Sequence, residues 1–131
     1  MTHGRAWAAA MTAFLVHNVE EVAGDLPSWA ASHSLLPRLG WMAGSGRFVV
    51  SIGVLTLTVG AIALFAMTTA PRWSRAVLVV FAVVMLVNAA SHVALSLWSS
   101  SLMPGTVTAA IIVAPVFVGV LLAVLRRRSP A

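Results

Sequence analysis

The chain has 131 residues, of which 60% are hydrophobic and 8% are charged. An ordinary soluble domain carries about 25% charged residues, so this composition excludes that class and predicts an integral membrane protein. The formal net charge of +5 comes from arginines that stand at the ends of apolar segments. This placement is typical of cytoplasmic helix ends and argues against nucleic acid as a partner. The absence of cysteine excludes disulfides and thiolate metal sites.

The first predicted helix covers residues 5–23. Its apolar run after Arg5 has the length of a signal-peptide core, but Glu21 stands three residues before a candidate cut after Ala23 and makes a poor cleavage site. We therefore expect a retained helix. A short interfacial helix is predicted within Ser28–Met42, where tryptophans suit the level of the lipid head groups.

Three longer apolar helices are predicted at residues 47–69, 74–98 and 105–127, the last with a bend at Pro115. The predicted fold is thus all-α, a four-transmembrane-helix bundle with a short interfacial helix between helices one and two. Residues 1–131 form a single integral membrane domain. Because arginines gather at Arg72, Arg75 and Arg126–Arg128, we expect both termini to be cytoplasmic.

The carboxylates of the chain stand within one short stretch, as Glu20, Glu21 and Asp25. On a helix, His17 shares a face with Glu21, and Glu20 flanks it three residues away. Carboxylates at membrane depth are costly unless they are paired, protonated, hydrated or bound to a metal. We expect Asp25 to be a loop residue, the other three to belong to a site, and His33 to be a reserve ligand.

A second polar pair, Asn88 and His92, shares one face of the helix predicted at 74–98. At ~1.5 Å rise per residue, His17 and Glu21 lie ~18–24 Å from the start of the first helix. The second pair lies ~21–27 Å from the start of its own helix, on the same side of the membrane. Both pairs are therefore predicted to meet in the outer half of the bilayer.

Two histidines with one or two glutamates suit zinc, or iron or manganese with open positions. We predict His17, Glu21 and His92 as ligands of a divalent metal, with zinc favoured. The candidate catalytic residues are Glu20, Glu21 and Asn88: a glutamate as general acid or base, and the amide orienting a ligand or a substrate oxygen. The alternatives are a structural polar network between helices and acids that are simply solvated at the outer interface.

Three motifs follow one another along the helices: His17-x-x-Glu20-Glu21, Asn88-x-x-x-His92 and Pro104-Gly105. With them the chain resembles, over nearly its whole length, the HXXEE-motif family of small bacterial integral membrane proteins. The resemblance implies a membrane fold, a set of marked residues and a place in the bacterial inner membrane. It implies no reaction, because the family is named for its motif alone.

Two classes of function are open at this point. One is a metal-dependent membrane enzyme acting on a lipid-like or isoprenoid substrate, by hydrolysis or by acid–base isomerisation or cyclisation. The other is a non-enzymatic protein, either a proton or metal-ion carrier subunit or a metal-binding accessory protein. The expected partners are the lipid bilayer and a lipid-like small molecule, and a homo-oligomer would complete a transport path.

Overall fold

The computed structural model describes residues 1–33 and 44–126, and these are all helical, without strands. The helices are α1 (His3–Ala23), α2 (Leu26–His33), α3 (Ser45–Thr69), α4 (Ser74–Ser99), α5 (Thr106–Thr108), the π-helical η2 (Ala109–Val113) and α6 (Ala114–Arg126). The first three long helices begin and end within two residues of the predicted bounds. The predicted end of the last helix, at residue 127, lies outside the described residues.

Three helices are long and apolar enough to cross a membrane: α3, α4 and the continuous helix Thr106–Arg126 formed by α5, η2 and α6. This is compatible with a membrane protein. Among the described helices, α1 does not meet the same criterion, although it has 21 residues. Its last turns carry the polar run His17–Glu21, which lowers its hydropathy.

The connection from α1 to α3 is held by Asp25. This residue adopts a positive φ of 51°, and its carboxylate accepts hydrogen bonds from the hydroxyls of Ser28 and Ser45. The Ser28 hydroxyl, together with that of Ser45, holds the pKa of Asp25 below its usual value. Asp25 is therefore the loop residue that the sequence predicts. The predicted interfacial segment is described only in part, as α2, because residues 34–43 lie outside the described residues.

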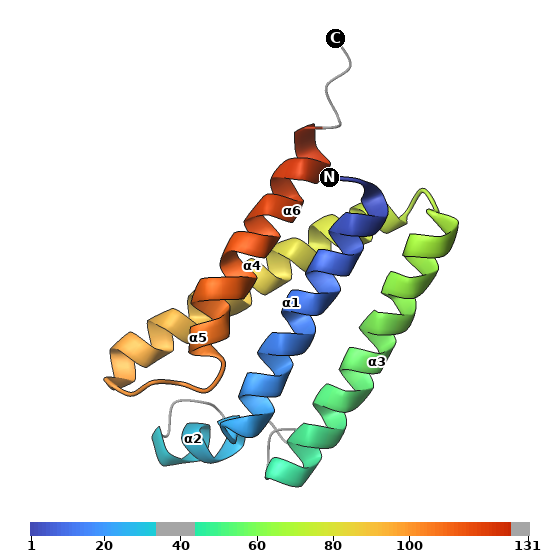
Figure 1. Ribbon diagram of the computed structural model, residues 1–131. Coiled ribbons are helices and arrows are strands. Elements are labelled where there is room, and N and C mark those ends of the chain that lie inside the picture. The colour runs from blue at the N-terminus through green and yellow to red at the C-terminus, as the bar shows by residue number, and fades with distance from the viewer. Residues whose placement is uncertain (34–43, 127–131) are drawn as a thin grey trace.

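The long helices form a bundle in which α1 lies between α3 and the last helix (Figure 1). On one side, α1 packs against α3 through small side chains, such as Ala10 and Ala66, that allow the backbones to approach closely. On the other side, α4 packs against η2 and α6. Phe81 of α4 joins these parts, with its ring edge-on to Phe14 at 5.3 Å and to Phe117 at 5.2 Å between centroids.

The last helix changes its hydrogen-bond pattern in the middle. The π-helical turn η2 ends at Val113, two residues before Pro115. Proline has no N–H to donate, and its ring crowds the carbonyl four residues earlier, so a widened turn here accommodates it. The structure thus shows a π-helical turn just before Pro115, and the bend predicted there stays a prediction.

The start of α1, the start of α4 and the end of α6 lie at the same end of the bundle (Figure 1). His3 Nε2 lies 2.9 Å from Ser74 Oγ, and Arg75 donates to the carbonyl of Val124. The arginines of these helix ends thus gather at one end, and the polar run of α1 lies toward the other.

Candidate functional site

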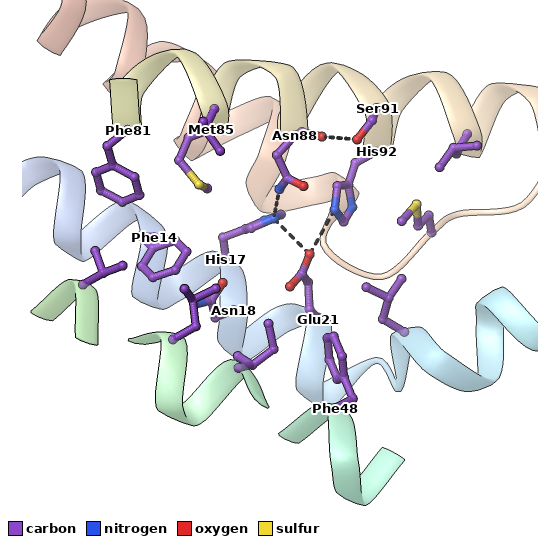
Figure 2. Close-up of a pocket in the computed structure, with 17 residues that line it drawn as sticks. Phe14, His17, Asn18, Glu21, Phe48, Phe81, Met85, Asn88, Ser91 and His92 are labelled. Atoms are coloured by element: carbon purple, nitrogen blue, oxygen red, sulfur yellow. Dashed lines mark hydrogen bonds and ion pairs between the residues drawn. The ribbon is translucent and has the colours of Figure 1, made fainter. Parts of the chain in front are cut away.

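Three side chains from two helices meet at a single carboxylate oxygen. Glu21 Oε1 lies 3.3 Å from His17 Nε2 on its own helix and 3.0 Å from His92 Nε2 on α4 (Figure 2). All three residues are buried, and their ligand atoms lie within 4.8 Å of one another. The group therefore has the composition and the spacing to hold a metal ion.

The neighbours of His17 fix which of its ring nitrogens carries hydrogen. Its Nδ1 lies 3.0 Å from the hydroxyl of Thr108. That hydroxyl has one hydrogen, and its other partners, the Gly105 carbonyl and the Glu20 carboxylate, can only accept. The hydroxyl therefore accepts from Nδ1–H of His17. Nε2 is left with its lone pair and accepts from the Asn88 amide at 2.8 Å.

This assignment leaves two acceptors facing each other. The single lone pair of His17 Nε2 accepts from Asn88, and Glu21 Oε1, a second acceptor, lies 3.3 Å from the same nitrogen. Two acceptors in a buried site repel unless a positive charge lies between them. A cation or a proton on Nε2 would attract Glu21 Oε1, but it would use the lone pair that accepts from Asn88, so the Asn88 amide would have to turn away.

His92 is held differently from His17. Its Nδ1 is one of two buried side-chain polar atoms that have no hydrogen-bond partner within the described residues, the other being Trp7 Nε1. The ring lies against Gly105, where an added Cβ would come within 2.7 Å of His92 Cε1 and 2.9 Å of Glu21 Cγ. Gly105 also has a φ of 91°, which favours glycine. The glycine of the predicted Pro104-Gly105 motif is thus required by close packing on the cluster.

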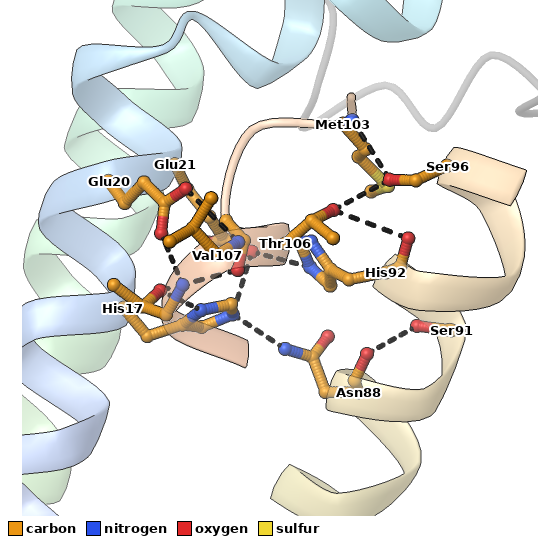
Figure 3. A network of polar contacts seen from close by, with 12 residues as sticks. His17, Glu20, Glu21, Asn88, Ser91, His92, Ser96, Met103, Thr106 and Val107 are labelled. Carbon is orange, nitrogen blue, oxygen red and sulfur yellow. Dashed lines mark hydrogen bonds and ion pairs between the residues drawn. The ribbon is translucent and has the colours of Figure 1, made fainter. Parts of the chain in front are cut away.

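Glu20 does not join the histidine cluster as Glu21 does. Its carboxylate accepts from the backbone N–H of Thr108 at 2.8 Å and of Val107 at 3.3 Å (Figure 3). These are amides of the first turn of the last helix, which have no acceptor inside that helix. Glu20 therefore connects α1 to the last helix, and it does not line the cavity described below. The geometry offers no support for the catalytic role predicted for it.

The loop before the last helix is fixed to α4 by hydroxyl groups. Thr106 Oγ1 donates to the His92 carbonyl at 3.3 Å and lies 2.7 Å from Ser96 Oγ. Ser96 Oγ in turn accepts from the Met103 N–H at 2.9 Å (Figure 3). These bonds fix the position along α4 at which Gly105 packs against His92.

The cluster forms the polar end of a cavity of about 390 Å³ (Figure 2). The other walls are mostly apolar and come from α1, α3 and α4, among them Phe14, Ile52, Phe81 and Met85. Asn88 and Asn18 add amide groups to the lining. A ligand in this space would meet hydrocarbon on most sides and the two imidazoles at one end.

The structure brings together His17, Glu21, Asn88 and His92, the four side chains that depth counting predicted to meet. The predicted reserve ligand is not among them: His33 Nδ1 lies 2.8 Å from the Trp29 carbonyl, and its ring stacks on that indole. The roles of the four clustered side chains in binding and catalysis remain predictions.

Sequence reasoning missed two polar residues near the site, Thr108 and Asn18. Asn18 Nδ2 donates to Thr56 Oγ1 at 2.8 Å and so connects α1 to α3. Thr108 stands in the first turns of a helix that begins at the end of the bundle where the motif lies. That position was the available signal, but an isolated hydroxyl in an apolar segment has no distinctive spacing.

A family model described as proteins of unknown function with an HXXEE motif matches residues 7–120. Neither a search among curated proteins nor one among solved structures found a match. The matched region contains His17, Glu20 and Glu21, and it extends over most of the bundle. The chain therefore belongs to the HXXEE-motif family.

Proposed function

We propose that His17, Glu21 and His92 hold a divalent metal ion. The observation that carries this proposal is the meeting of two imidazole nitrogens, His17 Nε2 and His92 Nε2, at one buried carboxylate oxygen of Glu21. Atoms bound to one zinc at about 2.0–2.2 Å and near-tetrahedral angles lie about 3.3–3.6 Å apart. The distances of 3.3 and 3.0 Å to Glu21 Oε1 are close to this range, and all three ligand atoms lie within 4.8 Å of one another. Binding would require a modest adjustment of the cluster, in which the Asn88 amide leaves His17 Nε2.

Zinc is the favoured ion, since two imidazoles and a carboxylate with one further position form a common catalytic zinc site. Iron or manganese suits the same ligands with more open positions. The acceptor on His17 Nδ1–H, Thr108, orients this ligand in the way that outer contacts orient metal-bound histidines.

The open position of such a metal would face the apolar cavity. The function we propose is therefore a metal-dependent membrane enzyme that acts on a lipid-like or isoprenoid substrate. A divalent ion held by His17, Glu21 and His92 would supply Lewis acidity for hydrolysis, and Asn88 would orient a substrate oxygen beside the cluster. With Glu20 engaged by the last helix, Glu21 is the carboxylate available to the chemistry.

A version without metal has its own supporting observation. A metal on His92 Nε2 would require hydrogen on Nδ1, and that nitrogen has no acceptor within the described part of the chain. If Nε2–H instead donates to Glu21, Nδ1 is a bare lone pair. The imidazole–carboxylate pair would then move protons to and from an apolar substrate, as isomerisation or cyclisation of an isoprenoid needs.

The alternative class is non-enzymatic, a proton or metal-ion carrier subunit or a metal-binding accessory protein. A conduit needs polar groups at several depths, whereas the described cluster lies at one level between α1 and α4. Between Phe48 and Thr69, α3 carries no ionisable side chain. A path would therefore require a second copy of the chain, so the enzyme is the proposal we favour.

We place the protein in the bacterial inner membrane with α1 as a fourth crossing and both termini in the cytoplasm. Support comes from the gathering of Arg5, Arg72, Arg75 and Arg126 at the helix ends that share one end of the bundle. A reporter fused to the C-terminus must then be active in the cytoplasm and inactive in the periplasm. Periplasmic activity would reverse the orientation.

The metal proposal predicts about one equivalent of zinc, iron or manganese in protein purified in detergent. His17→Ala and His92→Ala each remove a ligand and are expected to lose it, since three protein ligands are the minimum for such a site. Elemental analysis measures the content, and His33→Ala is the matched control, because that ring bonds outside the cluster. Metal-free wild type, with both variants equally stable, would refute the site.

The enzyme and the carrier make different predictions in the cell. An enzyme changes the amount of at least one lipid when the gene is deleted, and Glu21→Gln reproduces that change. Mass spectrometry of lipid extracts measures it. If no lipid changes and liposomes that contain the protein take up metal ions or protons, the carrier hypothesis is favoured and the enzyme hypothesis is refuted.

A further inference from the structure

The cavity is open on one side of the bundle. Its walls come from α1, α3 and α4, but α3 packs against α1 whereas α4 packs against η2 and α6. The two helices α3 and α4 diverge from the turn that joins them (Figure 1). No comparable packing joins α3 to α4 in the part of the chain that the structure describes.

Two side chains mark the edges of this opening. Leu55 of α3 and Val84 of α4 both line the cavity, yet they are 47% and 56% exposed. A residue that lines a cavity and is also half exposed stands at its mouth. The mouth thus lies between two of the three helices that can span a membrane, and it is bordered by apolar side chains.

The chemistry of the lining limits the head group that fits inside. Apart from the two histidines, none of the described lining residues is basic. Phosphate binding normally relies on arginine, lysine or clustered backbone N–H groups, so a phosphate-bearing lipid has no evident partner here. A hydroxyl, carbonyl or ester oxygen can accept from Asn88 or approach the ion held by the cluster.

The size of the cavity limits the apolar part. A volume of about 390 Å³ is near the lower end of the 300–1,000 Å³ range of ligand pockets. The apolar lining includes Phe14 and Phe81, whose rings contact each other, and Leu55 and Val84 at the mouth. This is room for one chain rather than two.

From these observations we infer that a single-chain lipid with an uncharged, oxygen-containing head enters sideways between α3 and α4. Its head lies at the His17–Glu21–His92 cluster and its chain extends through the mouth into the surrounding hydrocarbon. Fatty and isoprenoid alcohols, aldehydes and esters belong to this class, and two-chain phospholipids do not. The inference rests on the proposed function and names its substrate class and route of entry.

The test uses a photoreactive probe, hexadecanol with a diazirine near its hydroxyl, in liposomes that hold the full chain. After irradiation, mass spectrometry of the peptides is expected to find label on cavity residues such as Met85 and Ile52. Leu55→Trp and Val84→Trp fill the mouth and are expected to reduce this label about tenfold. Their matched controls are Leu57→Trp and Val83→Trp, which are exposed on the same helices and do not line the cavity.

Label that is absent from the cavity, or that all four variants leave unchanged, would overturn sideways entry. A two-chain phosphatidylcholine probe that labels the cavity as strongly as the alcohol would overturn the substrate class. Metal content is measured in the same samples, because the mouth variants should keep the ion whereas His17→Ala loses it. If the wild-type protein contains no metal but its cavity is still labelled, the lipid site is supported and the metal site is refuted. The two failures are therefore distinguishable.

Discussion

Gly105→Ala is expected to destabilise the protein by about 2–5 kcal/mol, as the sum of a left-handed backbone penalty and overpacking. The added methyl group would lie within 2.9 Å of Glu21 Cγ and His92 Nδ1 and closer still to His92 Cε1. The last helix must move away or the imidazole must turn. A turn of the imidazole moves His92 Nε2 away from Glu21, and a movement of the last helix disturbs the Thr108 contact to His17, so metal binding is expected to fall with stability. Thermal unfolding in detergent and elemental analysis measure the two effects.

Two other glycines separate the causes. Gly44 has a φ of 100° but nothing near its missing Cβ, so Gly44→Ala should show only the backbone penalty, about 1–3 kcal/mol, and keep the metal. Gly119 lies within α6 with open space around it, and alanine there should stabilise by about 0.5–1 kcal/mol. If Gly105→Ala behaves like Gly44→Ala in both measurements, the glycine is not required by the cluster.

Thr108→Val is expected to weaken metal binding by about 10–100-fold while the helices remain intact, as loss of an outer contact to a metal-bound histidine does. The change keeps the shape of the side chain but removes the oxygen that accepts from His17 Nδ1. The imidazole then loses the contact that keeps hydrogen off Nε2 and fixes the ring plane. Titration with Co²⁺, followed by its visible absorption, reports both the affinity and the ligand geometry.

The matched variant is Thr108→Ser, which keeps the hydroxyl and should bind Co²⁺ within a few-fold of wild type, with the same spectrum. A purely structural role for Thr108 would change unfolding alone and leave the Co²⁺ spectrum of both variants unaltered. Equal affinities of the valine and serine variants would show that the hydroxyl does not orient the ligand.

The sequence could predict that the polar pairs of α1 and α4 lie at the same level, because this depends only on regular helix geometry. The rise per residue and the four-residue spacing place His17 and Glu21 opposite Asn88 and His92 once the helix starts are known. The structure places these side chains as that calculation requires. Their use as ligands, and the membrane itself, remain predictions.

The sequence could not predict which of the two adjacent glutamates, Glu20 or Glu21, joins the histidine cluster. Neighbouring residues on a helix differ by about 100°, so Glu20 and Glu21 cannot both face one small site. Which of them faces α4 depends on where the last helix packs, and that is set by contacts such as Gly24 against Pro104, where a Cβ would come within 2.7 Å. The spacing of residues in the sequence does not predict that packing.

The bond between His17 and Thr108 spans 91 positions of the chain, and the bonds of Glu20 span almost as many. In a membrane, helices can form before they associate, so the cluster and its outer contact would exist only when α1, α4 and the last helix have docked. A ligand of the cluster binds the assembled bundle and not the separate helices. A metal ion at a hundred times its Kd would add about 2.7 kcal/mol to assembly. The same ion would thus stabilise the packing of α1 against α4 and, through Thr108, against the last helix during folding.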